Sequence, residues 1–98
     1  MILPTIHLNG TSADMLFEGY EEARQAVIEA RTKLEAVEFN SRDYYVQGPG
    51  VWNKAVDERR AMYAKLNSVE ADLLEIMAHV QTARDERAER NRLWDART

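Results

Sequence analysis

Cysteine is absent from this 98-residue chain, so disulfide scaffolds and thiolate zinc sites are excluded. The two histidines are too few to complete a metal site by themselves. No apolar run approaches the roughly 20 residues of a membrane-spanning helix, and the first residues lack the basic segment of a secretory signal. Acidic side chains outnumber basic ones by 17 to 13, which argues against a nucleic-acid binder. We therefore expect no metal, no nucleic acid and no membrane partner.

Enzyme signatures are missing as well. The chain has no phosphate-binding glycine loop, no Gly-x-Ser-x-Gly turn and no cysteine nucleophile. No pair of histidines shares one face of a predicted helix. We therefore expect a protein that is not an enzyme and that carries no cofactor.

Glycine and proline are scarce, and their positions divide the chain. Except for Gly19, they lie near the start of the chain or at Gly48-Pro49-Gly50. Residues 1–98 form a single domain by length. Within it we predict an extended arm over residues 1–11, a helix over 12–38, a loop over 39–50 and a second helix over 51–92.

Apolar residues recur at alternating spacings of three and four in both predicted helices, which is typical of paired α-helices. The stripe of the first helix is Leu16, Tyr20, Ala23, Val27, Ala30, Leu34 and Val37. The stripe of the second helix, in which only Arg59 is polar, is Trp52, Ala55, Arg59, Met62, Leu66, Val69, Leu73, Ile76, Val80 and Ala83. The pattern predicts an all-α fold, an antiparallel two-helix hairpin in which Val27 lies beside Met62.

Two helices bury too little apolar surface to be stable comfortably alone. A second stripe flanks the predicted seam and needs a cover; it consists of Phe17, Ile28, Val56, Tyr63 and Met77. A second copy supplies that cover most simply. We therefore predict a helical-bundle oligomer, with a homodimer favoured over higher states.

Two clusters of side chains could bind a ligand. The first precedes the first predicted helix, where free backbone N–H groups favour an anion, and comprises Thr5, His7, Asn9 and Thr11. The second lies in the loop and comprises Arg42, Asp43, Tyr44, Tyr45 and Gln47. Arginine pairs with phosphate, and tyrosine presents a large rigid ring for stacking. Together the clusters predict a site for a small nucleotide-type molecule.

Each cluster also has a purely structural interpretation. Residues 9–12 fit a turn followed by a helix cap. Tyr44 and Tyr45 could cover the end of the bundle, with Arg42 paired to Asp43 or Glu38. In one hairpin the two clusters lie at opposite ends, about 40 Å apart by the helix rise. They can therefore share one ligand only between subunits.

Two segments separated by a charged helix carry a resemblance. PTIHLNGTS at residues 4–12 and RDYYVQG at residues 42–48 resemble a group of small uncharacterised proteins of tailed phages and prophages. The resemblance covers most of the first half of the chain, and the second half is similar only as a generic amphipathic helix. It implies a phage origin and a location in the host cytoplasm, and it carries no activity. In size and style the chain is also similar to phage anti-defence sponges, which sequester nucleotide immune signals.

Two functions remain open at this point. One is a non-enzymatic phage protein that sequesters a small anionic nucleotide-type immune signal between its subunits. The alternative is a structural or adaptor hairpin that binds another phage or host protein.

Overall fold

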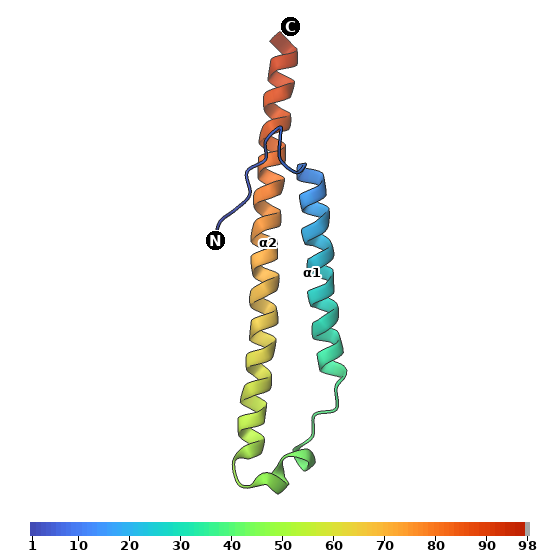
Figure 1. Ribbon diagram of the computed structural model, residues 1–98, viewed down its shortest axis with the longest axis vertical. Coiled ribbons are helices and arrows are strands. Elements are labelled where there is room, and N and C mark those ends of the chain that lie inside the picture. Colours follow the sequence, from blue (N-terminus) through green and yellow to red (C-terminus); the bar gives the residue numbers. More distant parts are fainter. Residues whose placement is uncertain (98) are drawn as a thin grey trace.

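The computed structural model describes residues 1–97, and its two long helices form an antiparallel hairpin (Figure 1). The elements are α1 (Ala13–Ala36), the short 3₁₀ turns η1 (Ser41–Asp43) and η2 (Tyr45–Gln47), and α2 (Val51–Arg97). No β-strand occurs in this described part of the chain. The hairpin is thin and long, with extents of 77 × 22 × 20 Å. The predicted all-α hairpin is therefore confirmed.

Helix α1 begins where its cap residues place it. The Ser12 side chain accepts a hydrogen bond from the Met15 N–H at 3.2 Å, and Asp14 adds an acid to the first turn. At the other end the backbone leaves the helix at Val37, whose N–H still donates to the Leu34 carbonyl. The helix thus ends at residue 36, two residues before the predicted end.

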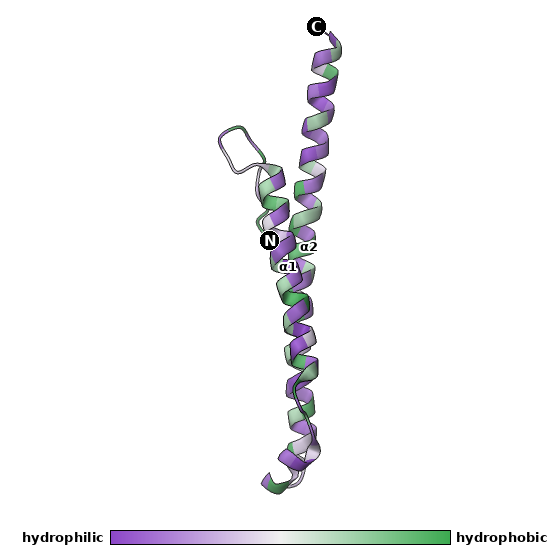
Figure 2. Ribbon diagram, turned by 90° about the vertical axis from the view of Figure 1, so that its right-hand side faces the viewer, coloured by the Kyte–Doolittle hydropathy of each residue, from purple (hydrophilic) through white to green (hydrophobic). Residues whose placement is uncertain are grey.

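Helix α2 begins after two glycines with positive φ, Gly48 and Gly50. It continues to Arg97, five residues beyond the predicted end at residue 92. Its last turns project past the start of α1 and the arm (Figure 1). Figure 2 shows that this projecting end is mostly hydrophilic, as a helix without a packing partner requires.

An aromatic cluster closes the loop end of the hairpin. The ring centroid of Phe39 lies 4.8 Å from that of Trp52 and 5.6 Å from that of Tyr44. The Arg59 guanidinium lies 4.5 Å from the Phe39 ring centroid and donates to the Leu34 carbonyl at 2.6 Å. The one polar residue of the predicted α2 seam is therefore satisfied by a ring face and a carbonyl oxygen.

The register of the two helices differs from the prediction. Leu34, rather than Val27, borders the same hollow as Met62. Further along, Arg31 of α1 donates to Asn67 of α2 at 2.9 Å. The cause is the connection after α1, where the backbone is extended at Val37 and the aromatic cluster takes up the first turns of α2. Helix α1 is therefore displaced toward the arm end.

The predicted seams face the other helix only in part. Tyr20, Val27 and Leu34 of α1 and Leu66, Leu73 and Val80 of α2 are half-buried or buried, but one edge of each seam is exposed. On α2, Met77 is buried, whereas Met62 and Val69 are each 45% exposed. On α1, Ala23 and Ala30 of the predicted stripe are exposed. The buried and half-buried positions of the facing flank are Phe17, Arg24, Arg31, Val56, Tyr63, Glu70, Met77 and Arg84. We call this the closed flank.

Ion pairs explain why the closed flank tolerates charge. Glu70 pairs with Arg31 at 2.8 Å and with Arg24 at 3.4 Å, and its side chain is only 17% exposed. Each charge of the closed flank therefore has an opposite charge beside it. The more apolar side is left open to solvent. Ala23, Ala30 and Val37 of α1 and Met62 and Val69 of α2 are exposed on this side, and Leu16, Ala55 and Ile76 beside them are half-buried; we call these eight residues the open flank.

The tightest packing lies where the arm crosses α2 beside the start of α1 (Figure 1). Ala13, Met77 and Val80 are the buried hydrophobic side chains within residues 1–97, and Val80 is 0% exposed. His79 Nε2 donates to the Pro4 carbonyl at 2.7 Å and ties the arm to α2. The arm thus packs on α2 beside the first turns of α1, which itself reaches the level of Arg84.

Candidate functional site

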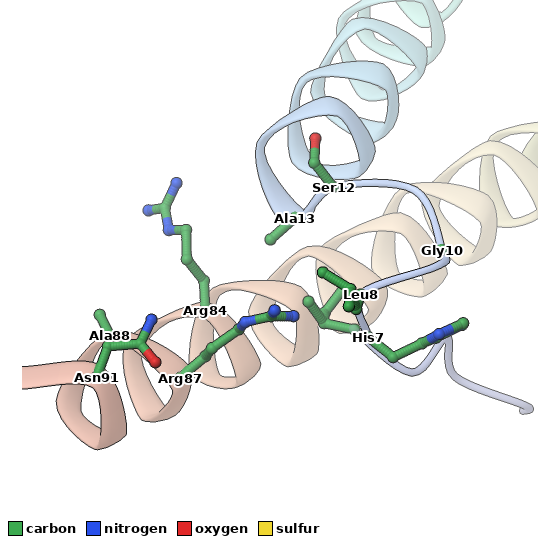
Figure 3. Close-up of a pocket in the computed structure, with 10 residues that line it drawn as sticks. His7, Leu8, Gly10, Ser12, Ala13, Arg84, Arg87, Ala88 and Asn91 are labelled. Atoms are coloured by element: carbon green, nitrogen blue, oxygen red, sulfur yellow. The ribbon is translucent and has the colours of Figure 1, made fainter. Parts of the chain in front are cut away.

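A hollow of about 380 Å³ opens between the arm, the first turn of α1 and the far part of α2 (Figure 3). We call it the arm hollow. From the arm and α1 it is lined by Ile6, His7, Leu8, Gly10, Ser12 and Ala13, and from α2 by Arg84, Arg87, Ala88 and Asn91. It thus joins an apolar wall to two arginines.

The first turn of α1 supplies backbone donors at this hollow. The N–H groups that open a helix have no partner within the helix, and the helix dipole makes them attractive to an anion. The Ser12 side chain takes up one of them, that of Met15. Ala13 and Asp14 precede Met15, so their N–H groups lie at the same helix end. An anion at the arm hollow would therefore meet a favourable electrostatic potential.

The two arginines of the hollow differ in their pairing. Arg84 donates to Asp14 at 2.7 Å and to the side chain of Gln81, so its charge is already neutralised. Arg87 is half-buried and makes no hydrogen bond or ion pair with any of residues 1–97. In Figure 3 its guanidinium extends toward the arm. Arg87 is therefore the cation that the hollow can offer to a ligand.

Most of the predicted site residues of the arm lie outside the arm hollow. Thr5, His7, Asn9 and Thr11 are all exposed, and of these four only His7 lines the hollow. The Gly10 N–H donates to the His7 carbonyl at 3.1 Å, which makes residues 7–10 a turn. With the Ser12 cap, the turn-and-cap interpretation of this segment is confirmed.

The loop cluster lies at the other end of the hairpin and separates into two parts. Tyr44 is half-buried, and its ring packs against those of Phe39 and Trp52, so it covers the hairpin end. Tyr45 is 64% exposed and does not cover the hairpin end. The other loop residues of the predicted site are exposed as well: Arg42, Asp43 and Gln47. A shallow hollow of about 310 Å³ beside the loop is lined by Tyr44, Gln47, Val51, Lys54, Ala55 and Glu58.

The structural alternative for Arg42 finds no support in the hydrogen bonds. The Glu38 carboxylate accepts from the Asn40 side chain at 3.0 Å instead. Within residues 1–97 Arg42 forms no ion pair or hydrogen bond. The arm hollow and the loop lie at opposite ends of the paired part of the two helices, as predicted, so one chain cannot join them (Figure 1).

Within residues 1–97, two carboxyl groups have shifted pKa values, and both lie on α1 or α2 away from the hollow. The hydrogen bond from Arg31, reinforced by the charges of Arg31 and Arg24, lowers the pKa of Glu70. The hydrogen bond from Gln25 and the nearby Arg24 lower the pKa of Glu21. The shift of Glu70 therefore comes from residues of the other helix, and that of Glu21 from residues of its own helix.

The sequence interpretation missed Arg84 and Arg87 as site residues. It assigned residues 84–92 to a solvated extension, because charge replaces the apolar pattern there. The predicted antiparallel topology could have identified these two arginines, because it brings this part of α2 to the start of α1. Within the described residues, no group of three or more metal-ligating side chains gathers, and no helix has the length and apolarity needed to cross a membrane.

Comparisons of the chain with protein-family models, with curated proteins and with solved structures found no match.

Proposed function

We propose that this chain is a non-catalytic binding protein whose arm hollow holds the phosphate of a small nucleotide-type ligand. The observation that carries the proposal is the half-buried Arg87, which has no partner among residues 1–97 and lines a hollow at the start of α1. A guanidinium and helix-start N–H groups are two donors that phosphate prefers. The apolar wall of Ile6 and Leu8 gives a base or ribose a surface to rest on.

The loop of a second copy is the proposed second half of the site. Arg42 has no partner within the described chain, and Tyr45 presents an exposed ring. In a dimer whose hairpins point in opposite directions, this loop comes to the end of the molecule that bears the arm hollow. A phosphate and a base could then be held from two chains, by Arg87 of one and by Arg42 and Tyr45 of the other.

The biological setting of the proposal comes from the phage resemblance. A small helical protein that binds a nucleotide without changing it would lower the free concentration of an immune signal. We propose that it does so in the cytoplasm of a bacterial cell that is infected by a phage or lysogenic for one. This step rests on analogy with phage sponges.

Isothermal titration against a panel of cyclic nucleotides and ADP-ribose derivatives tests the proposal. We expect at least one compound to bind and to be recovered chemically unchanged. Arg87→Ala should weaken that binding about tenfold or more, because a hydrogen bond to a charged group contributes about 1.5–3 kcal/mol. Arg90→Ala removes the same charge from an exposed position outside the hollow and should change little. Flat titrations across the panel would refute the proposal.

A structural or adaptor role is the second candidate, and the open flank favours it. Met62 and Val69 leave an apolar surface that another phage or host helix could cover. This role predicts flat titrations with every nucleotide. It also predicts that Met62→Glu abolishes binding to the protein partner whereas Arg87→Ala does not.

A further inference from the structure

The isolated chain exposes more surface than a stable monomer of its mass. Its accessible area is 7516 Å², whereas a folded monomer of 11.3 kDa exposes about 5,700 Å². Its radius of gyration is 21.4 Å, against about 13 Å for a compact domain of this length. The excess, about 1,800 Å², exceeds the roughly 800 Å² that each partner buries in a standard interface.

The open flank concentrates the apolar part of that surface on one face. The open-flank residues of α1 and of α2 lie on the same side of the hairpin, because residues of both helices line the same hollows. One of about 290 Å³ is lined by Leu34, Met62, Lys65, Leu66 and Val69, and its exposed lining is almost entirely apolar. A second of about 300 Å³ is lined by Met15, Leu16, Gly19, Tyr20, Ala23 and Leu73. The ion pairs of Glu70 belong to the closed flank, on the opposite face.

Gly19 adds an independent observation on this face. Glycine inside a helix weakens it, and a Cβ atom built at Gly19 would meet nothing within 4 Å. Packing within this chain therefore gives no reason for glycine at this position. A side chain from outside that approaches the helix backbone would give one.

We infer that the open flank is the docking surface for a second copy of this chain, pointing in the opposite direction. The charges beside the flank decide the direction. The contacts of Asp14 with Arg84 and of Arg31 with Asn67 place Lys33 at the level of Lys65. Two hairpins pointing the same way would set Lys33 of one against Lys65 of the other, which is repulsive.

Hairpins pointing opposite ways bring α2 against α2 and α1 against α1. A two-fold axis between residues 68 and 69 of α2, near the middle of the hairpin, then sets Lys65 opposite Asp72 of the second copy. The same axis sets Glu58 opposite His79. At the ends of the contact, the exposed Val37 of one chain comes within about one helical turn of the open space at Gly19 of the other. One axis therefore sets Lys65 against an opposite charge and brings an apolar side chain near the gap at Gly19.

Sedimentation equilibrium of the full chain without any nucleotide tests this inference separately from ligand binding. We expect a mass twice the 11.3 kDa of one chain. Met62→Glu should raise the dissociation constant at least about tenfold, because it buries a charge without a partner. Leu74→Glu is the matched control, since Leu74 is 44% exposed, much as Met62 is 45% exposed, but lies off the open flank. Circular dichroism of both variants monitors helix content.

Charge reversal tests the direction. Lys65→Glu and Asp72→Lys should each weaken the dimer, and the double variant should restore it. Hairpins that point the same way predict instead that Lys65→Glu strengthens association, by removing the repulsion from Lys33. A chain that stays monomeric at millimolar concentration, or equal effects of Met62→Glu and Leu74→Glu, would overturn the docking surface. A tighter Lys65→Glu dimer would overturn the direction.

Discussion

Val80 has no exposed surface, and shortening it is expected to loosen the point where the arm, α1 and α2 meet. The change Val80→Ala removes two carbon atoms, each contributing about 0.8 kcal/mol when buried, or roughly 1.6 kcal/mol together. The cavity left behind adds to this, so the free energy of unfolding should fall by about 2–3 kcal/mol. The melting temperature should fall by roughly 10 °C or more.

Urea unfolding followed by circular dichroism measures this change, at one fixed protein concentration because association alters apparent stability. Val46→Ala is the control, since it removes the same atoms from a loop side chain that is 72% exposed. It should shift stability by less than about 0.5 kcal/mol. Equal shifts for the two variants would refute the reasoning, because they would mean that Val80 is not buried in solution.

Three other predictions follow from the helices and the loop. The pKa of Glu70 is lowered in the folded chain, so its ionised carboxylate stabilises the hairpin above its ordinary pKa of 4.5. This contribution is lost as the pH falls through the lower folded pKa. The urea midpoint of Glu70→Gln should therefore vary less with pH in this range than that of the wild-type chain. Gly19→Ala in a Met62→Glu background should raise monomer stability by up to about 1 kcal/mol, whereas in the wild-type background it should weaken the dimer; thermal unfolding and sedimentation measure the two effects. Tyr44→Ala should lower the melting temperature by several degrees and Tyr45→Ala should leave it unchanged, because only the first ring packs in the aromatic cluster.

The hairpin could be predicted from the sequence because the three-four spacing of apolar residues fixes helix type and the position of the turn. The spacing could not decide which flank of each helix faces the other. Hydrophobicity favours placing Met62 and Val69 inside, whereas the fold places Glu70 there with two arginines beside it. Specific ion pairs between residues about 40 positions apart carry no periodic signal, so the choice of flank lay beyond a pattern-based prediction.

The candidate site was predictable only in outline. The helix start at Ser12 marks a place for an anion, and its cap is present as expected. The basic partner in the hollow is Arg87, which looks like any other charged residue until the antiparallel register brings it beside the arm. The loop tyrosines look alike in the sequence, and only the position of the Phe39 and Trp52 rings separates the buried Tyr44 from the exposed Tyr45.

Oxidative crosslinking of Val69→Cys measures the association of two opposed hairpins most directly. The chain has no cysteine of its own, so the introduced thiol, which lies beside the inferred two-fold axis, can pair only with its copy. The account predicts that mild oxidation converts most of the protein to a disulfide-linked dimer, while Leu74→Cys on another face stays largely monomeric. If Val69→Cys crosslinks no better than Leu74→Cys, the open flank is not where two chains meet.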